Sequence, residues 1–99
     1  MTEHSDWASL RARRMTEPGA EEAYHAARLA YELGKAIREL RQQRAWSQTD
    51  LARAADMTQS AVARFEAGGT MPTLPVLDRL ARALDADLTV TVTPRHDVA

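Results

Sequence analysis

The chain repeats hydrophobic positions with a helical period through much of its first half. Between residues 17 and 44, apolar side chains recur every three or four positions, which places them on one face of a helix. Pro18 stands near its start and Arg41 and Arg44 near its end, as first-turn geometry and the helix dipole favour. Gly34 marks a bend or a close packing contact. The predicted apolar stripe consists of Ala26, Leu29, Ala30, Leu33, Ile37 and Leu40.

A second helix is predicted over residues 48–55 by the residues around its start. Ser47 and Asp50 have the spacing of a capping box, in which each side chain accepts a backbone N–H of the other residue. Trp46 and Leu51 have the spacing of a hydrophobic staple, which fixes the entry of the chain into the helix.

A third helix is predicted over residues 59–67 after a turn of three residues. Asp56 in that turn tolerates the left-handed conformation better than most residues do. Thr58 suits the N-cap position, and Gly68 suits the position just past the C-terminus. The two short helices therefore follow each other closely.

The last part of the chain changes its period from helix to strand. Thr73 is the predicted cap of a fourth helix, whose buried face consists of Leu77, Leu80, Ala81 and Leu84. From residue 88 to residue 93, apolar residues alternate with threonines, and Pro94 closes the run. This period of two in β-branched residues predicts a strand.

A single predicted strand raises the question of what it pairs with. Its backbone groups can be satisfied by the same strand of a second copy, by the edge of a partner's sheet, or by neither if it lies on the fourth helix. Pairing of two copies of the strand about a two-fold axis is the interpretation that explains most, because a helix-turn-helix protein, which the two short helices suggest, needs a rigid dimer to read two half-sites. Leu88, Val90 and Val92 would then pack against both fourth helices and make the protein a homodimer.

Composition narrows the classes of function. The 99 residues suit one domain with an arm, and the absence of Cys excludes disulfides and thiolate metal sites. No apolar run reaches membrane-spanning length and the start is unlike a signal peptide, so we expect a cytoplasmic protein without a membrane partner. The histidines lack metal-ligand spacing, and no nucleophile, base and orienting group stand out as a set. We therefore expect no enzyme, no metal, no cofactor and no small-molecule ligand.

Charge alone is a weak guide to the partner. The formal net charge is −1, but residues 35–85 carry eight Lys and Arg against six Asp and Glu, which is +2. Such a balance does not by itself indicate nucleic acid, so the evidence must come from motif and geometry.

Two short helices joined by a tight turn and flanked by further helices favour a helix-turn-helix. The stretch "SQTDLARAADMTQSAVARFEAG" resembles that motif in the Xre/phage-repressor superfamily, and "RELRQQRAWSQTDLA" and "LDRLARALDADL" resemble its flanks. The chain departs from the family at Asp56, where Gly is usual, and after Gly68, where some relatives carry basic residues. The resemblance implies an all-α, phage-repressor-like bundle of 4–5 helices. The residue pattern adds a long N-terminal helical arm and one C-terminal β-strand that pairs across a dimer.

These features divide the chain into four segments. They are an N-terminal helical arm at 1–32, a helix-turn-helix DNA-binding domain at 33–85, a dimerisation strand at 86–94 and a tail at 95–99. The partner expected for the domain is double-stranded operator DNA.

The third helix is expected to read the DNA. Its exposed N-terminal side meets base edges in the major groove in such motifs. The residues expected to contact DNA on this helix are Thr58, Gln59, Ser60, Ala63 and Arg64. The resemblance implies that Gln48 touches phosphate and braces Gln59, and that Arg41 and Glu66 form a partly buried ion pair. Arg44 and Arg53 are candidates for phosphate contacts, with solvated surface arginines as the alternative.

The ends of the chain support a finer resemblance. The Ala- and Tyr-rich arm that leads into "YELGKAIRELR" is similar to that of HigA-type antitoxins, which neutralise a RelE-like ribonuclease and repress their own operon. Trp7, Leu10 and Arg14 are then candidates for binding the toxin; the alternatives are packing on the protein's own long helix or a grip on DNA. A stand-alone repressor and a protein-interaction module that no longer binds DNA remain alternative functions.

Overall fold

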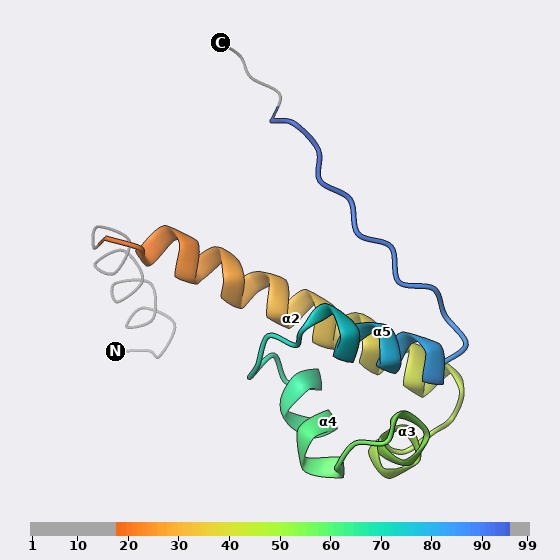
Figure 1. Ribbon diagram of the computed structural model, residues 1–99. Helices are drawn as coiled ribbons and strands as arrows, with labels where there is room; N and C mark the ends of the chain where they lie inside the picture. Colours follow the sequence, from red (N-terminus) through yellow and green to blue (C-terminus); the bar gives the residue numbers. More distant parts are fainter. Residues whose placement is uncertain (1–17, 96–99) are drawn as a thin grey trace.

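The computed structural model describes residues 18–95 and shows four helices and no strand in that range. They are α2 (Ala20–Gln43), α3 (Gln48–Ala55), α4 (Gln59–Glu66) and α5 (Leu74–Ala83). Helix α4 packs on α2 and α3, and α5 packs on α3, as Figure 1 shows. The prediction of an all-helical bundle is therefore confirmed for the described residues. None of these four helices is long and apolar enough to span a bilayer.

The three short helices begin at the predicted caps. Ser47 Oγ accepts the N–H of Asp50 at 3.0 Å, and Asp50 Oδ2 accepts the N–H of Ser47 at 2.8 Å, which is the predicted capping box. Hydrogen bonding of the Asp50 carboxylate to Ser47, first of all to the Ser47 backbone N–H, lowers the pKa of the Asp50 carboxyl. Thr58 and Thr73 cap α4 and α5 in the same way through their hydroxyl oxygens. Local hydrogen bonds thus define where each helix starts.

The turn between α3 and α4 depends on one left-handed residue. Asp56 has φ 57° and ψ 51°, so it adopts the conformation predicted for it without a glycine. The N–H of Met57 then donates to the carbonyl of Ala52 at 2.8 Å and closes the end of α3. Ala52 is 3% exposed, because its small side chain lies inside the packed helices.

The hydrophobic core lies between α3, α4 and α5 and the second half of α2. Leu51, Val62 and Leu80 are fully buried, one from each of the three short helices. The predicted buried face of α5 is confirmed, since its four residues are each at most 5% exposed. The whole buried cluster consists of Ile37, Leu51, Ala52, Ala55, Val62, Phe65, Leu77, Leu80 and Leu84.

The apolar stripe predicted along the long helix is buried only in part. Ala30 and Ile37 are buried, whereas Ala26 is exposed and Leu29 is 45% exposed. The reason is length: α2 has 24 residues, and its first half extends beyond the short helices (Figure 1).

Gly34 proves to be a close packing contact. A Cβ atom at this position would collide with the carbonyl oxygen of Phe65 and would lie 3.0 Å from that of Glu66. Glycine therefore lets the backbone of α2 touch the last turn of α4. The position decides how near these two helices come.

The predicted strand region is extended but unpaired in the single chain. Residues 86–95 form no ladder, and they run away from the helical body in Figure 1. Leu88 packs on the core, whereas Val90 and Val92 are 61% and 92% exposed. A strand needs a neighbouring strand to satisfy its backbone, and the described part of one chain does not contain a second one.

Replacing Gly34 by Ala tests the close contact between α2 and α4. An Ala in a helix interior is normally about 1 kcal/mol better than Gly. Here the clash with backbone should outweigh that gain, so we expect Gly34→Ala to lower the free energy of unfolding by about 1–3 kcal/mol in urea titrations. The neighbouring, exposed Lys35→Ala is the matched control and should change it by less than about 0.5 kcal/mol. A stabilised Gly34→Ala protein would contradict the contact.

Candidate nucleic-acid interface

Helix α4 has one buried face and one exposed polar face. Val62 and Phe65 point into the core, being 0% and 2% exposed, and they hold the helix in one orientation. The opposite face starts at the N-terminus of the helix and continues one turn on. It consists of the exposed Thr58, Gln59, Ser60 and Arg64 and the half-buried Ala63. The five residues predicted to contact DNA therefore share one side of α4.

The first residues of α3 and α4 are linked to each other. Gln48 begins α3 and Gln59 begins α4. Gln59 Nε2 donates a hydrogen bond to Gln48 Oε1 at 2.7 Å. The turn between the helices, with its left-handed residue, brings these two side chains together although eleven positions separate them. Gln59 is thereby held at the start of the exposed face.

Behind the two glutamines lies an ion pair between α2 and α4. Arg41 Nε donates to Glu66 Oε2 at 2.7 Å and Arg41 Nη2 donates to Glu66 Oε1 at 2.9 Å, so the contact is bidentate. The Arg41 and Glu66 side chains are 11% and 2% exposed. Hydrogen bonds from Arg41 to Glu66 raise the pKa of the guanidinium. The two side chains are therefore held against each other and largely shielded from solvent.

The ion pair and the two glutamines form one continuous set of hydrogen bonds. Gln48 Nε2 donates to Glu66 Oε1 at 3.1 Å, and Arg41 Nη1 donates to the carbonyl oxygen of Trp46 at 2.8 Å. We call Arg41, Glu66, Gln48 and Gln59 the polar chain. It runs from the interior to the exposed start of α4. Among the described residues, every buried side-chain nitrogen and oxygen has a hydrogen-bond partner.

The sequence, through its resemblance to the superfamily, predicted these residues as two separate pairs. It anticipated the contact of Arg41 with Glu66 and that of Gln48 with Gln59, but not the hydrogen bond from Gln48 to Glu66 that joins them. No local pattern marks that bond, because the two residues are eighteen positions apart.

The two other candidate arginines differ in their surroundings. The guanidinium of Arg44 lies 4.6 Å from the centre of the Trp46 ring, and Arg44 Nη1 donates to the carbonyl oxygen of Leu84 at 3.4 Å. These contacts tie Arg44 to the end of α5, and they were missed at the sequence level. Arg53 is exposed on α3 and borders a shallow depression with Trp46 and Asp50. Arg53 thus presents its charge to solvent, whereas Arg44 also has a packing role.

The residues predicted to bind a partner protein, and the possibility of a metal site, remain to be placed. Trp7, Leu10 and Arg14 lie outside the described residues. Within residues 18–95, no group of three or more His, Asp or Glu side chains is placed to hold a metal ion.

Comparison with known proteins bears on the same region. A family model described as helix-turn-helix matches residues 37–90, which include α3, α4, α5 and the end of α2. Neither the curated proteins nor the solved structures compared with the chain gave a match.

Removing the negative charge of the ion pair tests its contribution to stability. Glu66→Gln leaves the Arg41 guanidinium poorly solvated without its counterion, so we expect the free energy of unfolding to fall by about 3–5 kcal/mol. Asp78→Asn breaks the exposed pair of Asp78 with Arg82, whose side chains are 43% and 78% exposed, and is the matched control. Asp78→Asn should lower the free energy of unfolding by at most about 1 kcal/mol. Equal losses in urea titrations of the two variants would contradict a shielded ion pair.

Proposed function

The chain belongs to the Xre-type helix-turn-helix superfamily, and we propose that it is a sequence-specific transcriptional repressor that binds operator DNA as a homodimer. The observation that carries the proposal is the exposed N-terminal face of α4, on which Gln59 is held in place by Gln48. In this motif the second helix enters the major groove with its N-terminal end toward the bases.

The side chains on this face suit the edges of base pairs. Gln59 can pair with adenine through two hydrogen bonds, and Arg64 can reach guanine or a phosphate. Gln48 begins the preceding helix, where a polar side chain and backbone amides can meet a phosphate. Contacts to phosphate fix the position of the protein on the duplex, and contacts to bases supply sequence specificity.

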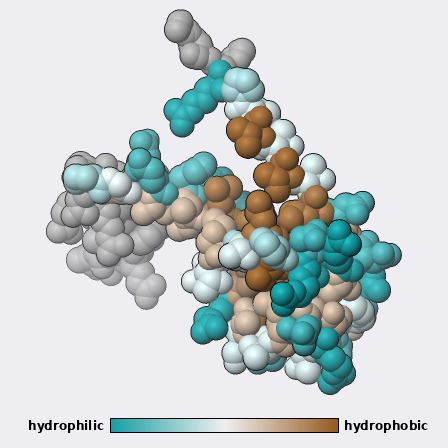
Figure 2. All heavy atoms as spheres, in the orientation of Figure 1, coloured by the Kyte–Doolittle hydropathy of each residue, from teal (hydrophilic) through white to brown (hydrophobic). Residues whose placement is uncertain are grey.

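The extended C-terminal segment supports the homodimer. Figure 2 shows hydrophobic side chains following one another along this segment beyond the helical body. Val90 and Val92 are exposed there, while Leu88 anchors the segment to the core. Pairing with the same segment of a second copy would satisfy the backbone and cover these side chains. It would also fix two copies of α4 for half-sites about one DNA turn apart.

The DNA-binding proposal is tested on duplexes selected by the protein from a random pool. We expect Gln59→Ala and Arg64→Ala each to weaken binding to the selected duplex by about 1–3 kcal/mol, with the helix content in circular dichroism unchanged. Arg82→Ala is the control for Arg64→Ala, because it removes another exposed positive charge, on α5, and should leave the affinity close to that of the wild type. If no duplex is enriched, the chain is better explained as a protein-interaction module.

The homodimer is tested by changing the extended segment. Val90→Asp places a charge where the two copies would meet, and Val92→Pro removes a backbone donor from the ladder. Each should shift the mass measured by light scattering from dimer to monomer and weaken binding to a duplex with two half-sites. The control Asp87→Asn lies at the start of the same segment and should remain dimeric. If both valine variants stay dimeric, the interface lies elsewhere.

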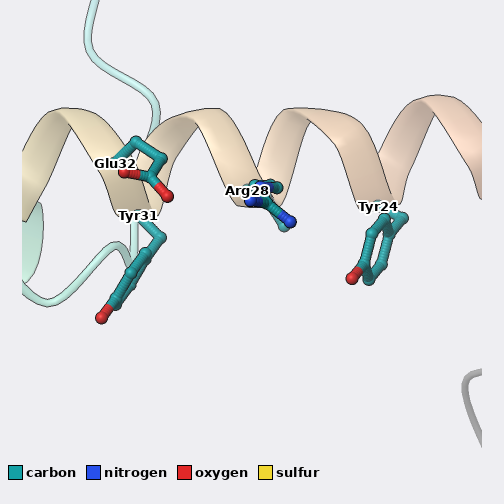
Figure 3. Close-up of a pocket in the computed structure, with 5 residues that line it drawn as sticks. Tyr24, Arg28, Tyr31 and Glu32 are labelled. Atoms are coloured by element: carbon teal, nitrogen blue, oxygen red, sulfur yellow. The ribbon is translucent and has the colours of Figure 1, made fainter.

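A second candidate function adds a toxin to the partners. The first half of α2 extends beyond the helical body and carries a shallow groove of about 430 Å³ (Figure 3). Tyrosine and arginine are enriched in protein interfaces, and here they line the groove together. Its lining consists of Tyr24, Ala27, Arg28, Tyr31 and Glu32. A repressor that also neutralises a RelE-like ribonuclease, as the resemblance to HigA-type antitoxins implies, would use this surface together with Trp7, Leu10 and Arg14.

The antitoxin candidate is tested by co-purification with any small basic protein encoded beside the gene. We expect Arg28→Glu combined with Tyr31→Ala, or deletion of residues 1–18, to weaken capture of that protein at least tenfold while the selected duplex is still bound. Lys35→Ala, which lies on α2 outside the groove, is the control. Loss of DNA binding with unchanged capture would instead assign the arm to DNA. The absence of such a neighbouring protein would leave the repressor proposal standing alone.

A further inference from the structure

The polar chain has a direction that its end groups impose. Arg41 has only donors and an ionised carboxylate has only acceptor sites, so the bidentate contact occupies both oxygens of Glu66 as acceptors. Whatever else approaches Glu66 Oε1 must be a donor. Gln48 therefore turns its NH₂ group toward Glu66, at 3.1 Å, and its carbonyl oxygen away from it.

The amide of Gln59 is constrained in the same way by Gln48. Gln48 Oε1 faces Gln59 and can only accept, so Gln59 must present its NH₂ group, which it does at 2.7 Å. The reversed amide of Gln59 would place two carbonyl oxygens against each other. One N–H and the carbonyl oxygen of Gln59 are left for a ligand, on a side chain that is exposed at the start of α4.

We infer that Glu66 is a positioning residue for base recognition: through Gln48 it fixes the amide of Gln59 as one donor and one acceptor, and so selects adenine. This inference rests on the proposed binding of DNA by α4. In the major groove adenine offers an acceptor at N7 and a donor at N6, whereas guanine offers two acceptors. An amide that is free to reverse can present its oxygen or its NH₂ toward a base and therefore discriminates less. The ion pair thus acts on specificity as well as on stability.

The inference is tested by measuring base preference. Fluorescence anisotropy gives the dissociation constants for the selected duplex and for duplexes changed at one base pair at a time. The position at which Gln59→Ala removes the preference is the one that Gln59 reads. A bidentate contact should make the wild type prefer adenine there by about 5- to 150-fold.

Two variants interrupt the polar chain at different places. Glu66→Gln offers an amide that can donate or accept, and Gln48→Met removes the link but leaves the ion pair intact. Each should reduce the adenine preference at the Gln59 position several-fold. Preferences at positions read by Arg64 should stay unchanged, which a general loss of folding would not allow. The double variant should show no larger loss of preference than either single variant, since both break one chain.

The outcomes separate this inference from the proposed function. If Gln59→Ala removes the preference while Glu66→Gln and Gln48→Met keep it, the polar chain does not act on specificity and the inference is overturned. If Gln59→Ala changes no base preference, the assignment of α4 as the reading helix fails as well. Should Glu66→Gln not fold, Gln48→Met decides alone: retained preference overturns the inference, and lost preference supports the link through Gln48 on which it depends.

Discussion

The shielded ion pair between Arg41 and Glu66 is the interaction on which the arrangement of the helices depends. It joins α2 to α4, and through the carbonyl oxygen of Trp46 and the side chain of Gln48 it also reaches the start of α3. Burying two charges is costly unless their hydrogen bonds are satisfied, and here both carboxylate oxygens and three guanidinium nitrogens have partners. A placement of α4 that separated the two side chains would leave these charges without their partners. Specific packing in this small bundle therefore has a polar component as well as a hydrophobic one.

Gly34 works together with the ion pair. Gly34 and Arg41 lie seven residues apart and so occupy the same face of α2, with Ile37 between them. The absent side chain lets α2 touch the carbonyl oxygens of Phe65 and Glu66, while the guanidinium two turns on holds the Glu66 carboxylate. Helices of eight residues such as α3 and α4 are unstable on their own, so these tertiary contacts and the caps must hold them. A rigid α4 is what reading a base sequence requires.

Two segments of the chain bury fewer side chains in the hydrophobic core than the three short helices do. The first half of α2 and the extended segment after α5 both leave the helical body, and both carry exposed apolar or aromatic side chains such as Tyr31, Leu29 and Val92. They are separate from the exposed face of α4. A DNA site, a second copy and a protein partner can therefore be accommodated on different parts of a short chain without competing for one surface.

What the sequence determined by itself was the local structure. The caps at Ser47, Thr58 and Thr73 and the left-handed Asp56 were predictable, because each depends on residues at most a few positions away. The resemblance to the Xre superfamily supplied the two halves of the polar chain. Neither source contained the hydrogen bond that joins them.

Tertiary structure alone decided the rest. The sequence placed Ala26 and Leu29 on an apolar stripe but did not decide how much of that stripe is buried, since a stripe does not tell where the neighbouring helices end. The alternatives left open for Gly34 were resolved only by the carbonyl oxygens of another helix. The alternating residues after Leu88 have strand character, yet they form no ladder in one chain, because a strand is completed by the backbone beside it. The pattern of side chains is a property of the sequence. The burial of a residue, the close approach of two helices and the pairing of a strand depend on which elements the fold places next to it.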